Sequence, residues 1–167
     1  MPLPDSFPDA PPFYRERPPR FEEETNLVSV GLDHHNRVAF LHPDAAAAWY
    51  RLCSAGKQTG IHLLLISAFR SYGRQTEIVR RKRAQGLSWD EILRVSAFPG
   101  FSEHHTGRAI DLASPECPTL IEAFEDTPEF AWLLQRADEF GFHLSYPRAS
   151  STGVVYEPWH WLWKAMD

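Results

Sequence analysis

The segment from Ser102 to Asp111 constrains the fold of this chain more than any other, because two histidines, a glycine and an aspartate fall within ten residues. Gly107 permits a tight reversal of the backbone, and the apolar residues 109–113 predict a strand. A histidine before the turn and an aspartate on the strand can then face the same point. The fold is therefore expected to hold this turn beside a sheet.

Histidine and aspartate are common ligands of zinc, and a catalytic zinc site keeps one coordination position open. A second polar cluster, Glu157 to His160, comes at the end of a predicted strand at 154–157. Two neighbouring strands could therefore supply three ligands, His104, Asp111 and His160. Glu157 would then remain free to accept a proton during a hydrolytic reaction.

The pattern alone leaves several assignments open. His105 competes with His104 as a ligand, and spacing cannot decide between them. Asp111 could be a buried, hydrogen-bonded carboxylate without a metal, and the second polar cluster could be a surface pair. Arg70, between a predicted strand and a predicted helix, is a candidate cation for negative charge that develops in a reaction.

Strands and helices follow one another in mixed order along the chain. Apolar alternation and apolar runs predict strands at about 27–31, 37–41, 61–69, 109–113, 142–146 and 154–157. Helix starts and stops predict helices at about 43–55, 71–85, 88–95 and 127–140. This order predicts an α+β fold with helices packed on one face of a mainly antiparallel sheet. Residues 1–25 are rich in proline and predict an extended N-terminal arm, followed by one domain at 26–167.

Composition excludes several classes of protein. The chain has 167 residues, 43% of them hydrophobic, and a formal net charge of -5, so we expect one globular domain without a nucleic-acid-binding face. The sequence shows neither a signal peptide nor an apolar run of membrane-spanning length. We therefore expect a cytoplasmic monomer, or a periplasmic or secreted protein if a leader has been removed. Cys53 and Cys117 are expected to be free thiols.

These polar blocks resemble the zinc D-alanyl-D-alanine carboxypeptidase family, in its VanY and L,D-carboxypeptidase branch. The dipeptidase VanX and the metal-binding domain of Hedgehog share the fold of that family. The family pattern Ser-x-His-x-x-Gly-x-Ala-x-Asp, then Glu-x-x-His, is matched by Ser102, His104, Gly107, Ala109, Asp111, Glu157 and His160. The upstream pattern Ser-x-x-Arg-Ser-x-x-x-Gln is matched by Ser67, Arg70, Ser71 and Gln75.

The resemblance implies a role for each matched side chain. It implies that zinc is bound by His104, Asp111 and His160 and that Glu157 is the general base. It also implies that Arg70 stabilises the carbonyl oxygen or its oxyanion. By the same resemblance, the residues expected to bind the substrate are Gln75, Ser102 and Trp159. The chain departs from the family at His105, where glutamine is common, and in the tail Trp161–Trp163.

The function implied by the resemblance is removal of the C-terminal D-alanine from peptidoglycan stem peptides or muropeptides. The bond cleaved would be an L,D or a D,D bond, with the L,D bond favoured. Two other functions fit the same motifs. One is a phage-type endopeptidase that cuts within the stem or the cross-bridge, and the other is a non-catalytic zinc-binding interaction domain.

Overall fold

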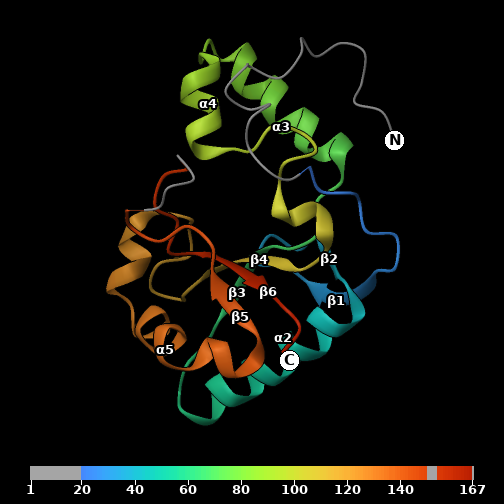
Figure 1. Cartoon of the computed structure of the whole chain (residues 1–167). Coiled ribbons are helices and arrows are strands. Elements are labelled where there is room, and N and C mark those ends of the chain that lie inside the picture. Colours follow the sequence, from blue (N-terminus) through green and yellow to red (C-terminus); the bar gives the residue numbers. More distant parts are fainter. Residues whose placement is uncertain (1–19, 150–153, 167) are drawn as a thin grey trace.

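A four-stranded antiparallel sheet lies at the centre of the fold, in the computed structural model that describes residues 20–149 and 154–166 (Figure 1). The strand order is β3–β4–β6–β5. These strands are β3 (Leu64–Ser67), β4 (Ala109–Ala113), β5 (Phe142–Leu144) and β6 (His160–Trp163). A separate antiparallel hairpin is formed by β1 (Val28–Leu32) and β2 (Val38–Leu41). The expected α+β class and antiparallel sheet are confirmed.

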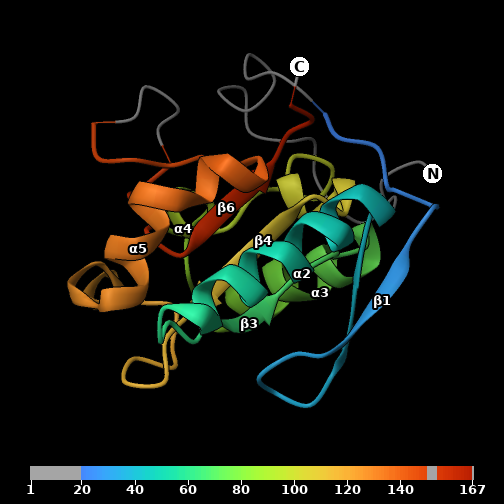
Figure 2. The same cartoon turned by 90° about the horizontal axis from the view of Figure 1, so that it is seen from below.

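One face of the sheet carries the hydrophobic core. Figure 2 shows α2 (Pro43–Gln58) lying across this face, and α5 (Pro128–Arg136) packs into the same core cluster. Ile110 and Leu112 of β4 and Trp161 of β6 are buried among the side chains of these helices. Because side chains alternate along a strand, the residues between them point to the opposite face.

The helices α3 (Tyr72–Ala84) and α4 (Trp89–Val95) lie together at the other end of the molecule from α2 and α5 (Figure 1). A capping box begins α4, with Ser88 and Glu91 each bonding the backbone of the other. A small apolar cluster around Leu93 and Phe98 supports this pair of helices. The sequence had suggested that the helices pack on one face of the sheet. In the structure they do not all lie on that face.

The predicted last strand at 154–157 is wrong. Those residues form no ladder with the sheet, and the strand is instead β6, which begins at His160, after Pro158. Proline has no amide hydrogen to donate, so the ladder forms beyond it. Glu157 donates its backbone N–H to the carbonyl of Tyr146 at 3.0 Å.

Other expected elements differ in their bounds, three of them by three residues or more. The predicted strand at 61–69 is shorter in the structure, and the first helix continues to Gln58. The helix predicted at 127–140 ends at Arg136 and continues as a 3-10 turn, η3 (Ala137–Phe140). Two further 3-10 turns are η1 (Glu103–Thr106) and η2 (Glu122–Asp126).

Half-buried Cys53 and Cys117 are free, as expected.

Most of the predicted N-terminal arm at 1–25 lies outside the described residues. The part that is described, from Arg20 onward, runs along the turn that precedes β4. Phe21 donates its N–H to the carbonyl of Gly100 at 2.7 Å, and Glu24 donates to that of His105 at 2.8 Å. Within the described ranges, no helix has the length and apolar character needed to cross a membrane.

Candidate metal centre and active site

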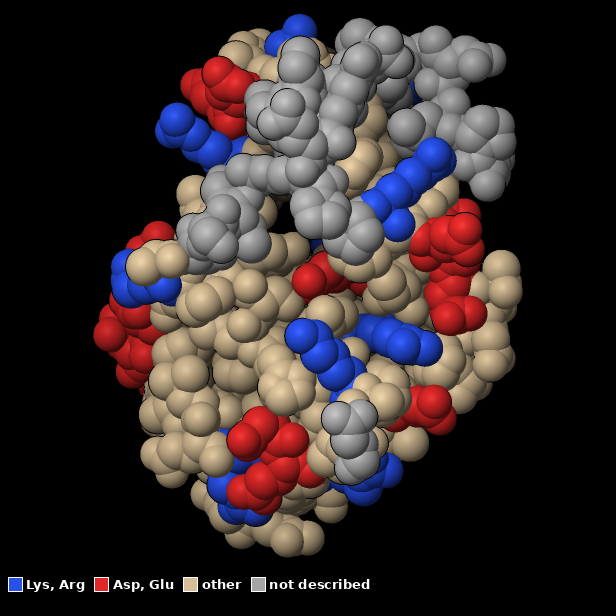
Figure 3. All heavy atoms as spheres, viewed as in Figure 1, with Lys and Arg blue, Asp and Glu red and all other residues tan. Residues whose placement is uncertain are grey.

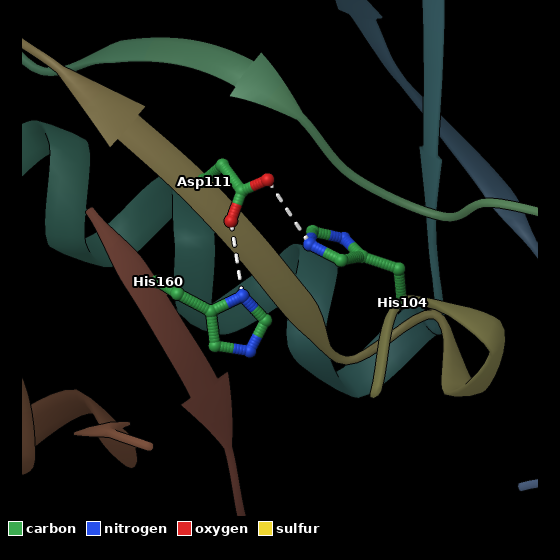
Figure 4. Close-up of side chains that lie close together, drawn as sticks. All are labelled: His104, Asp111 and His160. Carbon is green, nitrogen blue, oxygen red and sulfur yellow. Dashed lines mark hydrogen bonds and ion pairs between the residues drawn. The ribbon is translucent and has the colours of Figure 1, made fainter. Parts of the chain in front are cut away.

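His104, Asp111 and His160 form one buried group (Figure 4). His104 Nε2 lies 3.1 Å from Asp111 Oδ2, and His160 Nδ1 lies 3.0 Å from Asp111 Oδ1. One potential ligand atom from each residue lies within 4.8 Å of the others. Two imidazoles and a carboxylate at this spacing fit a zinc ion that keeps a position open for substrate or water.

The strand pairing explains why these three side chains meet. Asp111 in β4 is paired directly with His160 in β6, and both face away from the core. His104 comes from η1, which Ser102 caps by accepting the His104 N–H at 3.3 Å. Gly107 ends η1 with a φ of 64°, and a Cβ there would lie 2.8 Å from Leu27 Cδ2. Only glycine fits this turn without displacement of its neighbours.

Hydrogen bonds outside the group fix the orientation of both imidazoles. His104 Nδ1 donates to the carbonyl of Ala68 at 2.7 Å, which leaves Nε2 to face Asp111. His160 Nε2 donates to Glu103 Oε2 at 2.7 Å, which leaves Nδ1 to face Asp111. Such outer partners hold ligand rings in place and set which nitrogen binds the metal.

Glu103 was not identified from the sequence as a functional residue. It lines the pocket, and Ser145 Oγ donates to the same carboxylate oxygen at 2.7 Å. Its position directly before His104 was visible in the sequence, but its partner His160 is 57 residues away. Only the fold brings them together.

The charges of this group favour the binding of a metal cation. Burial alone would lower the pKa of His160, but hydrogen bonds to Asp111 and Glu103 outweigh it and raise the pKa to about 10. Burial alone would raise the pKa of Asp111, but the charge of His104, together with bonds from both imidazoles, holds that pKa well below its usual range. A ligand imidazole must give up its proton at the binding nitrogen, so metal binding and proton release are coupled here.

Glu157 lies beside the group without belonging to it. Its Oε2 is 4.0 Å from His160 Nδ1, and its side chain is 12% exposed. Burial raises the pKa of Glu157 to about 7, and the negative charge of Asp111 acts in the same direction, whereas His160 and Arg70 oppose it. A carboxylate whose pKa lies near neutrality is suited to accept and return a proton.

Arg70 is held beside the group by two hydrogen bonds. Its Nη1 donates to Gln75 Oε1 at 2.9 Å and its Nη2 to Ser67 Oγ at 3.0 Å, and Nη2 lies 3.6 Å from Asp111 Oδ2. Burial lowers the pKa of Arg70, against the attraction of Asp111, yet a guanidinium remains charged at neutral pH. Three of the four matched upstream residues, Ser67, Arg70 and Gln75, are therefore joined by hydrogen bonds with Arg70 at the centre.

The structure places Gln75 behind Arg70. Gln75 is fully buried, and its Nε2 donates to the carbonyl of Ala97 at 2.7 Å. It is absent from the described residues that line the pocket, whereas Ser102 and Trp159 are among them. Gln75 thus contacts Arg70 and the backbone of Ala97, and its expected contact with substrate stays a prediction.

The structure also separates His104 from His105. His105 Nδ1 donates to the carbonyl of Arg70 at 2.6 Å, and its Nε2 accepts the N–H of Gly100 at 3.0 Å. Burial lowers the pKa of His105 to about 4, so the ring is neutral. Both nitrogens are thus occupied, and His105 links the backbones of Arg70 and Gly100.

A pocket of about 420 Å³ opens in front of the group. One wall is the side of the sheet that carries Asp111 and His160, with Glu157 and Trp159, and the other is formed mainly by side chains of α3 and α4. Apolar side chains line much of the second wall, namely Ile78, Leu93 and Val95, and Phe101, from the segment after α4, also lines the pocket. On the described part of the face shown in Figure 3, acidic and basic side chains are interspersed and separated by uncharged surface.

Comparison with known proteins gives consistent matches. The family model described as D-alanyl-D-alanine carboxypeptidase (VanY) matches residues 38–166. YodJ of Bacillus subtilis (strain 168) is 33% identical over 136 residues, which cover 80% of this chain and 50% of YodJ. The bifunctional D-Ala-D-Ala dipeptidase and carboxypeptidase VanXYC of Enterococcus gallinarum is 32% identical over 147 residues, covering 83% of this chain and 74% of VanXYC.

The solved structure of the LdcB LD-carboxypeptidase is similar over 87% of this chain and 71% of that chain, with 31% identity and a TM-score of 0.76. The chain spans only half the length of YodJ.

Proposed function

Because this chain belongs to the VanY family of D-alanyl-D-alanine carboxypeptidases, we propose that it is a zinc-dependent carboxypeptidase acting on peptidoglycan stem peptides. The observation that carries this proposal is the buried group of His104, Asp111 and His160 with Glu157 next to it in one pocket. The group has the donor set of a catalytic zinc site, and the remaining carboxylate is placed as a base.

The side chains divide the work of hydrolysis among them. His104, Asp111 and His160 would hold the zinc ion, which when bound supplies a Lewis acid that polarises the scissile carbonyl. Glu157 accepts a proton from the attacking water and passes it to the leaving amine of D-alanine. Arg70, fixed by Ser67 and Gln75, offers its charge to the oxygen on which negative charge develops.

The bond that we propose as preferred is the L,D bond at the end of a tetrapeptide stem. Support comes from the LdcB LD-carboxypeptidase, whose structure matches 87% of this chain with a TM-score of 0.76. VanXYC, by its name, acts on D-Ala-D-Ala, and it matches this chain at a similar identity. Both bonds therefore belong in the first assay.

The test is release of D-alanine from two muropeptides by the zinc-loaded protein. One is a tetrapeptide ending in an L,D bond, and the other is a pentapeptide ending in D-Ala-D-Ala. We expect release from the tetrapeptide, its loss after treatment with a chelator, and its return when zinc is added. Release from the pentapeptide alone would replace the L,D assignment by a D,D one. No release from either peptide, with zinc bound, would overturn the proposed function.

A further inference from the structure

Lys82 is the pocket cation that the reaction outlined above does not use. Among the described residues that line the pocket, it is the only lysine and Arg70 the only arginine. Lys82 lies on α3, is half-buried, and donates from Nζ to Ser96 Oγ at 2.7 Å. Ser96 is the residue that ends α4. The two side chains thus meet in the second wall of the pocket, between α3 and the end of α4.

In the part of the chain that the structure describes, this ammonium group has no ion-pair partner, and the charge of Glu157 acts on it only from beyond ion-pair distance. In the described parts of the chain, no carboxylate lies within ion-pair distance of Lys82 Nζ, and Ser96 accepts only one of its three hydrogens. Ile78, Leu93 and Val95 form apolar surface in the same wall. Burial lowers the pKa of Lys82, and the charges of Arg70 and Arg81 act in the same direction, whereas the charge of Glu157 opposes them without cancelling them. An anion bound here would relieve this imbalance.

The other basic residues of α3 differ from Lys82 in their contacts. Arg74 pairs with Glu77 at 2.9 Å, and Arg83 donates to the carbonyl of Leu87 and lies over the ring of Trp89. None of these residues is among those lining the pocket. A solvated helix face explains them, whereas Lys82 faces the cavity in which a peptide would lie.

We propose that Lys82, together with Ser96, forms a subsite that binds a carboxylate of the substrate peptide. The inference rests on the proposed function and adds to it a requirement for an anionic group on the peptide. Two parts of a stem peptide can provide that group. One is the carboxylate of the terminal D-alanine, and the other is a free carboxylate on a residue before the scissile bond.

The test uses two pairs of peptides and two variants. In one pair the C-terminal carboxylate is replaced by an amide, and in the other the carboxylate upstream of the scissile bond is replaced. Lys82→Met removes the charge and keeps a side chain of similar length. Arg81→Met is the matched control, since Arg81 is the exposed neighbour on the same helix and lies outside the pocket lining.

For the wild type and Arg81→Met we expect that, in one of the two pairs, the peptide with the free carboxylate is the better substrate. For Lys82→Met we expect KM for that peptide to rise roughly 10-fold or more, with a smaller change in kcat and with the preference over the amide lost. The pair that loses its preference identifies the source of the carboxylate. If Lys82→Met keeps the KM and both preferences of the wild type, the inference is wrong.

Binding of the same peptides separates this inference from the proposed function. Calorimetry on the zinc-loaded Glu157→Gln protein measures affinity without turnover, with and without the additional Lys82→Met change. Binding that depends on Lys82, in a wild-type protein that releases no D-alanine, would overturn only the proposed function. Hydrolysis with a carboxylate preference that does not depend on Lys82 would overturn only the subsite. Absence of both binding and hydrolysis would overturn both.

Discussion

The substitution Glu157→Gln is expected to make the metal-free protein more stable while it removes activity. Glu157 is buried, and burial raises its pKa from 4.5 to about 7. A carboxyl whose pKa is raised on folding stabilises the folded state fully only below the pKa of the unfolded chain. That contribution is lost as the pH rises toward 7. Glutamine has nearly the same shape and carries no charge, so it avoids this loss.

The size of the effect follows from the two pKa values. The gap between 4.5 and about 7 corresponds to roughly 3 kcal/mol once the pH is well above 7. Between about pH 5 and about pH 8.5, the advantage of the variant should grow by roughly 2–3 kcal/mol. For a chain of this size, the Tm of the variant minus that of the wild type should therefore increase by roughly 4–12 °C between the two pH values. Urea denaturation of the chelator-treated proteins at both pH values measures the difference.

The same variant tests the role of Glu157 in the reaction. It should retain zinc, because Glu157 is outside the ligand group, and it should lose D-alanine release roughly 100-fold or more. Metal analysis and D-alanine release from the tetrapeptide provide the two readings. Glu116→Gln, at an exposed position outside the pocket lining, is the control and should change neither quantity. A stability difference that stays constant with pH, or a variant with wild-type turnover, would refute the reasoning.

Three further changes test the supports of the site. Glu103→Ala should weaken zinc binding roughly 10- to 100-fold, because His160 loses its outer partner. Competition with a chelating indicator measures the affinity, and an unchanged value would contradict this role of Glu103. Gln75→Ala should lower kcat with little change in zinc content, because Arg70 loses an acceptor, and equal kinetics would argue against that link. Gly107→Ala should destabilise the protein by about 2–4 kcal/mol in urea denaturation, since a Cβ meets Leu27 at 2.8 Å in a left-handed turn. A loss below about 0.5 kcal/mol would contradict that account.

The local part of the metal group could be predicted from the sequence. His104, Gly107 and Asp111 are close along the chain, so a turn followed by a strand is enough to bring the two polar side chains together. The choice between His104 and His105 was beyond local spacing, because it depends on which nitrogens the surrounding backbone occupies. In the structure, Gly100 and Arg70 occupy both nitrogens of His105.

The non-local contacts were predicted less well. Residues 154–157 have the β-branched and aromatic side chains typical of strands, but a strand also needs a neighbour with free backbone groups. The available edge of β4 is instead paired with β6, after Pro158. The partners of Gln75 and the place of Glu103 in the site were not predicted, for the same reason. Their partners are fixed by tertiary packing, which puts one behind Arg70 and the other against His160.

The register between β4 and β6 links the metal group to the stability of the fold. Ile110 is paired with Trp161 on the core side, and Asp111 is paired with His160 on the pocket side. A slip of β6 by one residue would reverse both assignments, since side chains alternate along a strand. Trp161 would leave the core and His160 would enter it, where neither Asp111 nor Glu103 could reach it. The apolar contacts that hold the sheet on α2 and α5 therefore also hold the third ligand in the pocket.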